Sequence, residues 1–285
     1  MPISGSSDPA APDRYHVRSV ERALSILKLF LTGEGELNLA EISARMQLPQ
    51  STAFRLLVTL RSSGLIEQSK NNGKYRLGTT SLALGGAFLR SSDLRQSAKD
   101  SLEALRDRCG ETVHLAVLDK LEVIYLDKLA GLHPIGLMSS RVGDRSPAHC
   151  TGLGKALLAQ LSDAEIRERY TNTPLRRYTP NTITHLGTLL KDLAEIRAQG
   201  YAIDDEEHEA GVACVAAPIF DSAGTAAALS VAGPSQRINE QLKSRELPRV
   251  VRQAAAQVSV RLGGGEKAAA PSPRPRRPAL TRFGS

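Results

Sequence analysis

Cysteine and histidine supply much of the nucleophilic and metal-binding chemistry of proteins, and this chain of 285 residues has three cysteines and six histidines. Two places bring them close in sequence: His149 precedes Cys150 directly, and Asp204 is followed by His208 and Cys214. Neither group has the ligand spacing of a zinc motif or the local signature of a catalytic cysteine. We therefore expect small buried thiols, no catalysis, and no metal or other cofactor. A metal- or thiol-dependent enzyme joined to a second domain is the alternative.

Gly152 and Gly154 offer a different chemistry, since they flank Leu153 just before an apolar helix that is expected to begin near Lys155. Free amide groups at the N-terminus of a helix can hold a carboxylate without a dedicated cation, and glycine allows a ligand to come close. A loop that needs glycine only for its own backbone is the other interpretation. The motif by itself does not decide between the two.

Asp204 opens the densest acidic run of the chain, which lies between Tyr201 and Gly211. A run of charges usually forms a solvated face of a protein. We adopt that interpretation for the glutamates of this segment, which are Glu206, Glu207 and Glu209.

A polar face is predicted on a helix that begins at Pro49 and ends near Ser63. At about 100° per residue, one side carries hydroxyls and a single arginine, with Val58 as its one apolar member. That side consists of Ser51, Thr52, Arg55, Thr59 and Ser62, and the opposite, buried arc consists of Ala53, Phe54, Leu56, Leu57 and Leu60. Hydroxyls and arginine can contact base edges and phosphates in a DNA major groove, and the helix N-terminus offers amides to a phosphate.

The elements around this helix predict a winged helix-turn-helix. A helix is expected over 17–31, and Asn38 and Glu41 form a capping box for a second helix that ends near Met46. Strands at 65–68 and 74–77 form a hairpin, in which Lys70 and Lys74 could contact the DNA backbone as a wing. A plain three-helix bundle with a solvated polar face is the alternative. The complete order of helices, tight turn and basic hairpin favours the winged helix.

The rest of the chain mixes helices and strands without regular alternation, which predicts an α+β fold. Five segments are expected: a disordered tail at 1–14, the DNA-binding domain at 15–78, a linker helix at 79–94, a larger domain at 95–263, and a disordered basic tail at 264–285. In the larger domain we expect helices at 95–109, 152–161, 163–170, 186–199 and 239–262, and extended segments at 112–118, 122–129, 134–139, 213–220 and 225–232.

Positive charge is concentrated in two parts of the chain. The net charge is +7, and residues 15–78 hold nine Lys and Arg against five Asp and Glu, whereas residues 79–263 hold 22 of each sign. The last 22 residues carry five basic groups and one acidic group. Such basic patches are expected in proteins that bind a polyanion. No apolar run is long enough to cross a membrane, and the odd, widely spaced cysteines predict reduced thiols in a cytoplasmic protein.

Several motifs together resemble the IclR family of bacterial transcription regulators. The N-terminal match runs from RSVERALSILKLF through LNLAEISARMQLPQSTAFRLLVTLRSSGLIEQ to KYRLG, within residues 18–78. It continues through GETV at 110–113, HCTGLGKALLA at 149–159, GYAIDDEEHEAGVACVAAPIFD at 200–221 and LSVAGP at 229–234. The resemblance implies a GAF-like effector domain, and dimers that often pair into tetramers. It also implies that Gln50, Ser51, Thr52 and Arg55 enter the major groove.

The same resemblance implies the residues of an effector site. In similar regulators the first aspartate of the acidic run and the cysteine ten residues later line the pocket, which here are Asp204 and Cys214. Ser230 matches a pocket hydroxyl of the family, whereas Ala232 stands where several relatives carry a second serine. The ligand of any particular relative is therefore not transferred to this chain. Further candidates for this site are Gly152, Leu153, Val212, Leu137 and Met138.

These observations predict a transcription regulator, with repression as the expected direction. A small organic carboxylate from catabolism would bind between the sheet and the segment 149–159, and would shift the linker 79–94 and the spacing of paired winged helices on double-stranded operator DNA. The expected assembly is a homodimer or a tetramer, with no membrane partner. An architectural DNA-binding protein without a ligand is disfavoured, because the neutral region 79–263 is far larger than dimerisation needs.

Overall fold

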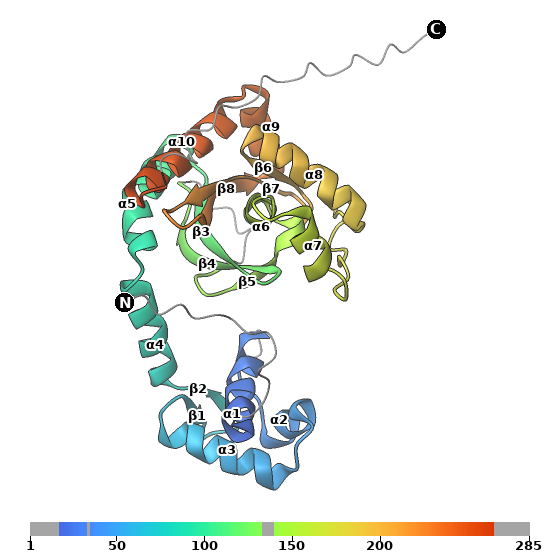
Figure 1. Cartoon of the computed structure of the whole chain (residues 1–285). Helices are drawn as coiled ribbons and strands as arrows, with labels where there is room; N and C mark the ends of the chain where they lie inside the picture. Colours follow the sequence, from blue (N-terminus) through green and yellow to red (C-terminus); the bar gives the residue numbers. More distant parts are fainter. Residues whose placement is uncertain (1–16, 33–34, 133–139, 265–285) are drawn as a thin grey trace, which may run out of the picture. The chain divides into compact units, whose positions relative to one another are not determined.

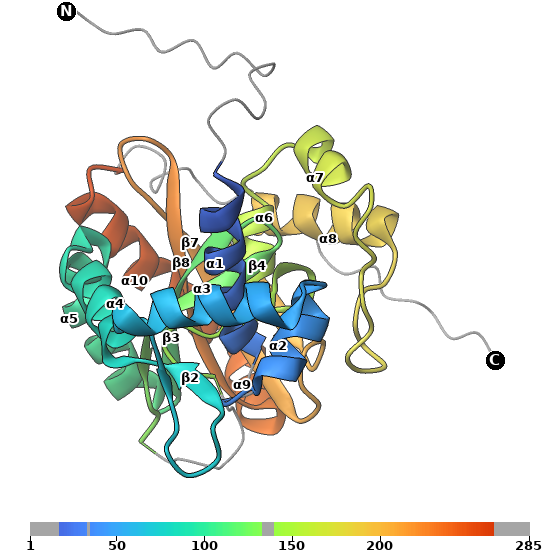
Figure 2. The same cartoon turned by 90° about the horizontal axis from the view of Figure 1, so that it is seen from below.

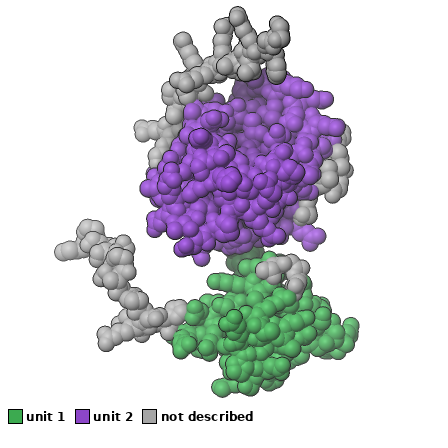
Figure 3. Space-filling view, turned by 90° about the vertical axis from the view of Figure 1, so that its right-hand side faces the viewer, with its two compact units in different colours: residues 1–91 green, residues 92–285 purple. Residues whose placement is uncertain are grey.

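The computed structural model describes residues 17–32, 35–132 and 140–264. The chain divides into two compact units, residues 1–91 (unit 1) and residues 92–285 (unit 2), which are coloured separately in Figure 3. The extended segment expected at 134–139, with Leu137 and Met138, lies outside the described residues. So do the tail expected at 1–14 and, apart from Gly264, the tail expected at 264–285.

Unit 1 contains the three helices and the hairpin that the sequence predicts (Figure 1). Its elements are α1 (Arg18–Leu29), η1 (Phe30–Thr32), α2 (Leu39–Met46), α3 (Gln50–Ser62), β1 (Ile66–Gln68), β2 (Tyr75–Leu77) and α4 (Thr79–Arg90). The three helices and the hairpin share one small core, which includes Ile26, Leu37, Ile42, Leu57 and Ile66. α4 follows the hairpin and buries none of its 12 residues.

Local hydrogen bonds cap α2 and hold the turn between α2 and α3. Asn38 caps α2: its side chain accepts the amide of Glu41 at 2.9 Å, and Glu41 accepts the amide of Asn38 at 2.7 Å, so the predicted capping box is confirmed. Gln47 ends α2 in the left-handed conformation, and Ser43 donates its hydroxyl to the carbonyl of Leu48 in the turn. Helix α3 is therefore held on α2 by a short, hydrogen-bonded connection.

Unit 2 is built on a six-stranded antiparallel sheet with the strand order β5-β4-β3-β8-β7-β6. The strands are β3 (Thr112–Asp119), β4 (Glu122–Leu129), β5 (Arg145–Pro147), β6 (Ala202–Asp205), β7 (Val212–Phe220) and β8 (Thr225–Pro234). The long hairpins β3–β4 and β7–β8 meet at the centre of the sheet through the pairing of β3 with β8. Figures 1 and 2 show the curled sheet with helices on both of its faces.

Each face of the sheet supports a separate core, because alternate side chains of a strand point to opposite faces. Helices α5 (Asp93–Cys109), α9 (Ser235–Lys243) and α10 (Glu246–Arg261) cover the face of Leu115 and Val215. On the face of Ala116 and Ala216 lie η2 (Ala148–Cys150) and α6 (Gly152–Leu158), and α7 (Asp163–Arg169) and α8 (Leu186–Gln199) add to the same core. Small side chains on this second face let α6 pack close to the strands. They are Ala116, Ala216, Ala228 and Ala232.

The main corrections to the predicted elements are in the connections between them. The single helix predicted at 239–262 is two helices, α9 and α10, because Arg245 has φ of 58° and breaks the helical path. The linker helix predicted at 79–94 ends at Arg90, and Ser92 caps α5 by accepting the amide of Arg95. The edge strands β5 and β6 were not predicted, since they have only three and four residues. None of the described helices is long and apolar enough to span a membrane.

Candidate functional site

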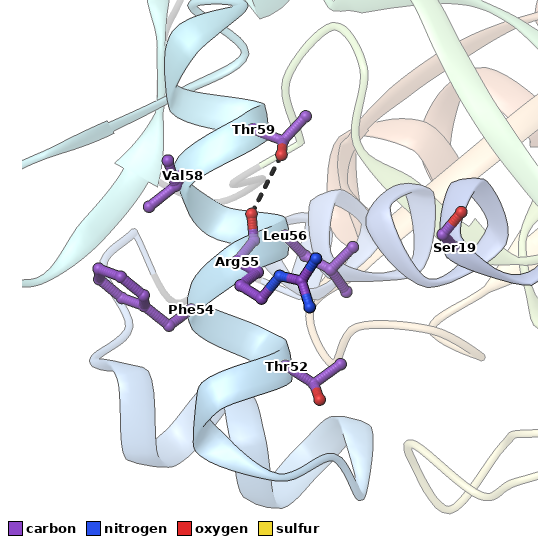
Figure 4. A pocket seen from close by; sticks show the side chains of 7 residues that line it. All are labelled: Ser19, Thr52, Phe54, Arg55, Leu56, Val58 and Thr59. Atoms are coloured by element: carbon purple, nitrogen blue, oxygen red, sulfur yellow. Dashed lines mark hydrogen bonds between the residues drawn. The ribbon is translucent and has the colours of Figure 1, made fainter.

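The outer face of α3 carries exposed polar side chains. Ser51 and Arg55 are exposed, Thr52 is half-buried, and the buried side of the helix is formed by Ala53, Leu57 and Leu60. Within the described residues, the Arg55 guanidinium makes no hydrogen bond or ion pair, and only its backbone carbonyl is used, as acceptor for the Thr59 hydroxyl at 3.1 Å (Figure 4). The face therefore presents an uncompensated positive charge beside a hydroxyl.

The N-terminus of α3 is also open. Pro49 precedes the helix and provides no side-chain cap, and its carbonyl accepts the amides of Thr52 and Ala53. Pro49 is thus the capping residue rather than the first helical residue that the sequence predicted. Exposed Gln50 is the first residue of the helix. Uncapped first-turn amides point along the helix axis and favour an anion such as a phosphate.

One side chain of α3 departs from the predicted helical wheel. Phe54, predicted in the buried arc, is 48% exposed, whereas Val58, predicted on the polar side, is 38% exposed as expected. Phe54 is exposed because the buried side of α3 is narrow. Only Ala53, Leu57 and Leu60 are buried on this helix, and Leu56 is half-buried. An open groove of about 530 Å³ follows this helix, lined by Ser19 of α1 and by α3 residues (Figure 4). The α3 residues are Thr52, Phe54, Arg55, Leu56, Val58 and Thr59.

The hairpin after α3 supplies further cations. Lys70 is exposed at its tip and Lys74 is half-buried, and neither ammonium group has a hydrogen bond or ion pair in the part of the chain that the structure describes. Arg76, by contrast, is held by Glu67 at 2.5 Å and by Glu36 at 3.5 Å. The hairpin therefore contains both a structural ion pair and free lysines that can contact a phosphate backbone.

In unit 2, strand pairing brings the predicted effector residues to one face of the sheet. Asp204 pairs with Cys214, and Cys214 pairs with Ala232 on the next strand. Ser230 lies two residues from Ala232 on β8 and so shares its face. Leu153 of α6 belongs to the same buried cluster as Cys214 and Ala232. Val212 lies two residues from Cys214 on β7, near the end of that strand, and is buried as well.

Gly152 and Gly154 are required by close packing. A Cβ on Gly152 would lie 2.6 Å from Sγ of Cys214, and one on Gly154 would lie 2.3 Å from the backbone of Ala148. The helix begins at Gly152 rather than near Lys155, and Thr151 caps it by accepting the amide of Gly154 at 3.2 Å. The interpretation that the glycines serve the backbone thus has direct support, and the close approach also brings the start of α6 onto Cys214.

The polar groups on this face are deeply buried. Burial raises the pKa of the Asp204 carboxyl to about 7, although its Oδ1 accepts the amide of Glu207 at 2.8 Å. Burial likewise raises the pKa of the Cys214 thiol to about 12. Ser230 is fully buried beside this thiol, and its interaction with the thiol lowers the pKa of Cys214 by less than burial raises it. The Ser230 hydroxyl makes no hydrogen bond to a nitrogen or oxygen atom among the described residues. A carboxyl that is about half protonated, a neutral thiol and a buried hydroxyl therefore lie together at neutral pH.

Glu207 corrects the prediction that the glutamates of the acidic run are solvated. It is buried and bonds to Nζ of Lys155, which is only 2% exposed and also lies 3.0 Å from Oδ2 of Asp192 on α8. Burial lowers the pKa of Lys155, but the two carboxylates outweigh it and raise that pKa above its usual value. No sequence pattern indicates this network, because Lys155, Asp192 and Glu207 lie on three separate segments of the chain. The network ties α6 and α8 to the segment that positions Asp204.

His149 and Cys150, which are adjacent in sequence, each contact a backbone carbonyl. His149 Nε2 lies 3.0 Å from the carbonyl oxygen of Arg176, and burial lowers the pKa of His149. Burial raises the pKa of the neighbouring Cys150, whose thiol lies 4.0 Å from the carbonyl of Pro147. The described residues contain no cluster of three or more His, Cys, Asp and Glu side chains that could hold a metal ion.

Sequence comparisons match both units to one family. Residues 19–70 match the IclR helix-turn-helix domain, and residues 86–260 match the family described as bacterial transcriptional regulator IclR C-terminal. The HTH-type transcriptional regulator XynR of Escherichia coli (strain K12) is 41% identical and covers 79% of this chain and 89% of its own length. The transcriptional repressor IclR of the same strain is 36% identical, over 93% of this chain and 98% of its own.

A solved structure leads to the same family. An IclR homologue from Microbacterium hydrocarbonoxydans, complexed with 4-hydroxybenzoate, is similar with a TM-score of 0.73 and 30% identity over 86% of this chain and 98% of its own. The α+β fold predicted from the sequence, with its N-terminal helix-turn-helix, is thereby confirmed. The matches extend over both units and agree with the open face of α3. The chain is a DNA-binding transcription regulator and belongs to the IclR family.

Proposed function

We propose that this regulator represses transcription by binding double-stranded operator DNA through α3 and the β1–β2 hairpin, and that a small organic carboxylate bound in unit 2 controls its DNA affinity. The observation that carries the proposal is the exposed Arg55, whose guanidinium has no partner among the described residues and which lies beside Ser51 near an uncapped helix N-terminus. Repression is supported by the name of the relative IclR, which is a transcriptional repressor.

On the DNA side, the side chains divide into two roles. Gln50, Ser51, Thr52 and Arg55 are proposed to contact base edges and nearby phosphates, because they occupy the first turns of α3 and reach solvent. Lys70 and Lys74 are proposed to hold the phosphate backbone without sequence preference. Their ammonium groups have no internal counter-charge among the described residues, so binding DNA replaces water and ions rather than a protein contact.

The effector is proposed to bind against Asp204, Cys214 and Ser230, with Gly152, Leu153 and Val212 completing the wall. Among the described residues the buried Ser230 hydroxyl has only the Cys214 thiol, a weak partner, beside it, and a ligand acceptor would give it a stronger hydrogen bond. Because its pKa is about 7, the Asp204 carboxyl can hold a proton at neutral pH and donate it to a ligand carboxylate. The complex of the Microbacterium homologue with 4-hydroxybenzoate gives one example of a carboxylate bound to a relative.

Coupling between the two sites is proposed to act through assembly. A homodimer, or a tetramer made from two of them, places two α3 helices at half-sites about one duplex turn apart or a multiple of that distance. A ligand that binds one arrangement of the subunits more tightly shifts the population toward that arrangement. The factor by which the ligand changes the affinity for DNA then equals the factor by which DNA changes the affinity for the ligand. α4 joins unit 1 to unit 2, and it is the segment through which such a shift would pass.

The DNA assignment is tested with the double variant Ser51→Ala/Arg55→Ala on an operator selected in vitro from random duplexes. Loss of one arginine contact and one hydroxyl contact is expected to weaken operator binding about 100-fold, with a smaller effect on random DNA. The variant Arg167→Ala/Thr171→Ala removes an exposed arginine and a hydroxyl at the end of α7 in unit 2 and controls for the change in charge. Full operator affinity in the α3 variant would overturn the assignment.

The effector assignment is tested by thermal unfolding with a panel of short-chain and aromatic carboxylates, each beside its neutral amide. A binding carboxylate is expected to raise the melting temperature of unit 2 and to change operator affinity, whereas its amide does neither. Ser230→Ala and Asp204→Ala are expected to abolish the shift. Equal effects of acid and amide, or none of the panel acting on the protein, would reject the carboxylate class.

A further inference from the structure

Phe54 is the largest apolar side chain on the outer face of α3, and the fold gives it no core to enter. It is 48% exposed, while its neighbour Ala53 faces the buried side of the helix with no exposure at all. The helix thus buries a methyl group and leaves a phenyl ring in solvent. If burial of apolar surface alone decided, the phenyl ring of Phe54 would be buried and the methyl group of Ala53 exposed. A large side chain kept outside in this way is explained if it has a contact that unit 1 does not contain.

The position of Phe54 relative to the proposed DNA-contacting residues is defined by helix geometry. Phe54 lies three residues after Ser51 and four before Val58, so these three side chains share one face of α3, and Arg55 lies four residues after Ser51. Figure 4 shows Phe54 and Val58 on one side of the exposed face and Arg55 on the other. A surface that receives Ser51 and Arg55 therefore also meets the phenyl ring.

The charges around the ring identify the kind of surface. Arg55 on α3 and Lys70 and Lys74 in the hairpin carry positive charges that have no counter-charge among the residues that the structure describes. Uncompensated cations favour a polyanion over a second copy of this basic unit. In the major groove of DNA the exposed apolar group is the C5 methyl of thymine, and phenylalanine is one of the side chains that contacts it.

We propose that Phe54, with Val58 one turn later, contacts a thymine methyl in each operator half-site and so sets sequence preference on the side of α3 opposite to Arg55. This inference rests on the proposed binding of DNA by α3 and adds a specificity-determining residue to it. It predicts a half-site in which at least one thymine is required for its methyl group rather than for its hydrogen bonds.

The test removes the methyl from the DNA and the ring from the protein. Thymines of the in vitro-selected operator are replaced one at a time by deoxyuridine, which keeps every base-pairing and groove hydrogen-bonding group. With the full-length protein, one position in each half-site is expected to lose about fourfold in affinity, the effect of removing one buried methyl. With Phe54→Ala that same position is expected to become insensitive to deoxyuridine. Phe54→Leu is expected to retain part of the effect.

Control variants distinguish the contact between Phe54 and thymine from the binding of DNA by α3 as a whole. Arg55→Ala should bind the operator more weakly yet keep the fourfold deoxyuridine effect, and Tyr178→Ala, which removes an exposed ring from unit 2, should keep it too. If no thymine responds, or if Phe54→Ala responds as the unmodified protein does, the contact does not exist even though α3 binds DNA. If Phe54→Ala changes the oligomeric state and weakens all duplexes equally, the ring contacts a second copy instead, and the proposal is wrong. Full affinity of the Ser51→Ala/Arg55→Ala variant would instead reject α3 as the DNA-binding element.

Discussion

The two units treat their polar side chains in opposite ways. On α3 and the hairpin of unit 1, Arg55, Lys70 and Lys74 reach solvent without counter-charges among the described residues. In unit 2, Lys155 and Glu207 are buried against each other, and Asp204 is buried with an amide as partner. A surface for a large polyanion needs charges that are free to exchange water and ions for phosphate. A site for a small molecule needs groups held in place before the ligand arrives. Four experiments test this contrast, and the largest expected effect comes first.

The buried network of unit 2 is expected to be sensitive to loss of its cation. Lys155→Met leaves Glu207 buried without a positive partner, and removing one member of a buried ion pair costs about 3–5 kcal/mol. Lys243→Met, which removes an exposed lysine, is the matched control and should cost almost nothing. Urea unfolding of the two variants measures the difference. Equal stability would show that Lys155 contributes little, and the double variant Lys155→Met/Glu207→Gln should recover part of the loss.

The close approach of α6 to the sheet predicts a smaller effect. Gly152→Ala places a methyl group 2.6 Å from Sγ of Cys214 and is expected to cost about 1–3 kcal/mol through overpacking. Cys214→Ala in the same chain removes the obstructing sulfur, so the double variant should be less destabilised than the sum of the single variants. Gly187→Ala, where the added methyl meets nothing within 4 Å, is the control. Additive losses in the double variant would mean that the sulfur is not the obstacle.

The raised pKa of Asp204 predicts a dependence of stability on pH. A carboxyl with a pKa of about 7 in the fold and about 3.9 in the unfolded chain makes the protein less stable as pH rises from about 4 to about 7. Asp204→Asn cannot ionise and keeps an acceptor for the amide of Glu207. Its stability relative to the natural chain should therefore increase with pH across this window, by at most about 1.4 kcal/mol per pH unit. Exposed Asp205→Asn should show no such trend; if it does, another group is responsible.

The free lysines of the hairpin predict the smallest effect. Lys70→Ala should weaken binding to all DNA sequences by a similar factor and lower the slope of log affinity against log salt by about one. Titrations of the selected operator and of a random duplex at several salt concentrations measure that slope. A loss that is confined to the operator would show that Lys70 contacts a base instead.

Patterns that depend on neighbouring residues could be predicted from the sequence. The capping box of Asn38 and Glu41 is visible because both partners lie within one helical turn. The strands β3, β4, β7 and β8 are long and apolar, and they were predicted within one or two residues of their observed bounds. The break at Arg245 was missed, because an arginine in the left-handed conformation has no signature comparable with glycine or proline.

Features that depend on distant packing could not be predicted in the same way. From its sequence context Glu207 is expected to be a solvated acid. In the fold it is buried against Lys155, 52 residues away along the chain, and Lys155 also contacts Asp192, 15 residues from Glu207. Phe54 falls on the border of the apolar arc, and the exposure of its ring depends on how narrow the contact between α3 and the rest of unit 1 is. The roles of the site residues stay predictions until the variants described above are measured.

The helix α4 exposes apolar side chains, and this affects how it folds. It has 12 residues, buries none of them, and exposes Leu82 by 78% and Phe88 by 60%. An isolated helix of this length is only marginally stable in water, and apolar side chains of this size favour a covered state. Folding of α4 and assembly of the subunits are therefore expected to be a single equilibrium. The helicity of this segment then depends on protein concentration, and a cell that makes more of the regulator also makes more of it structured.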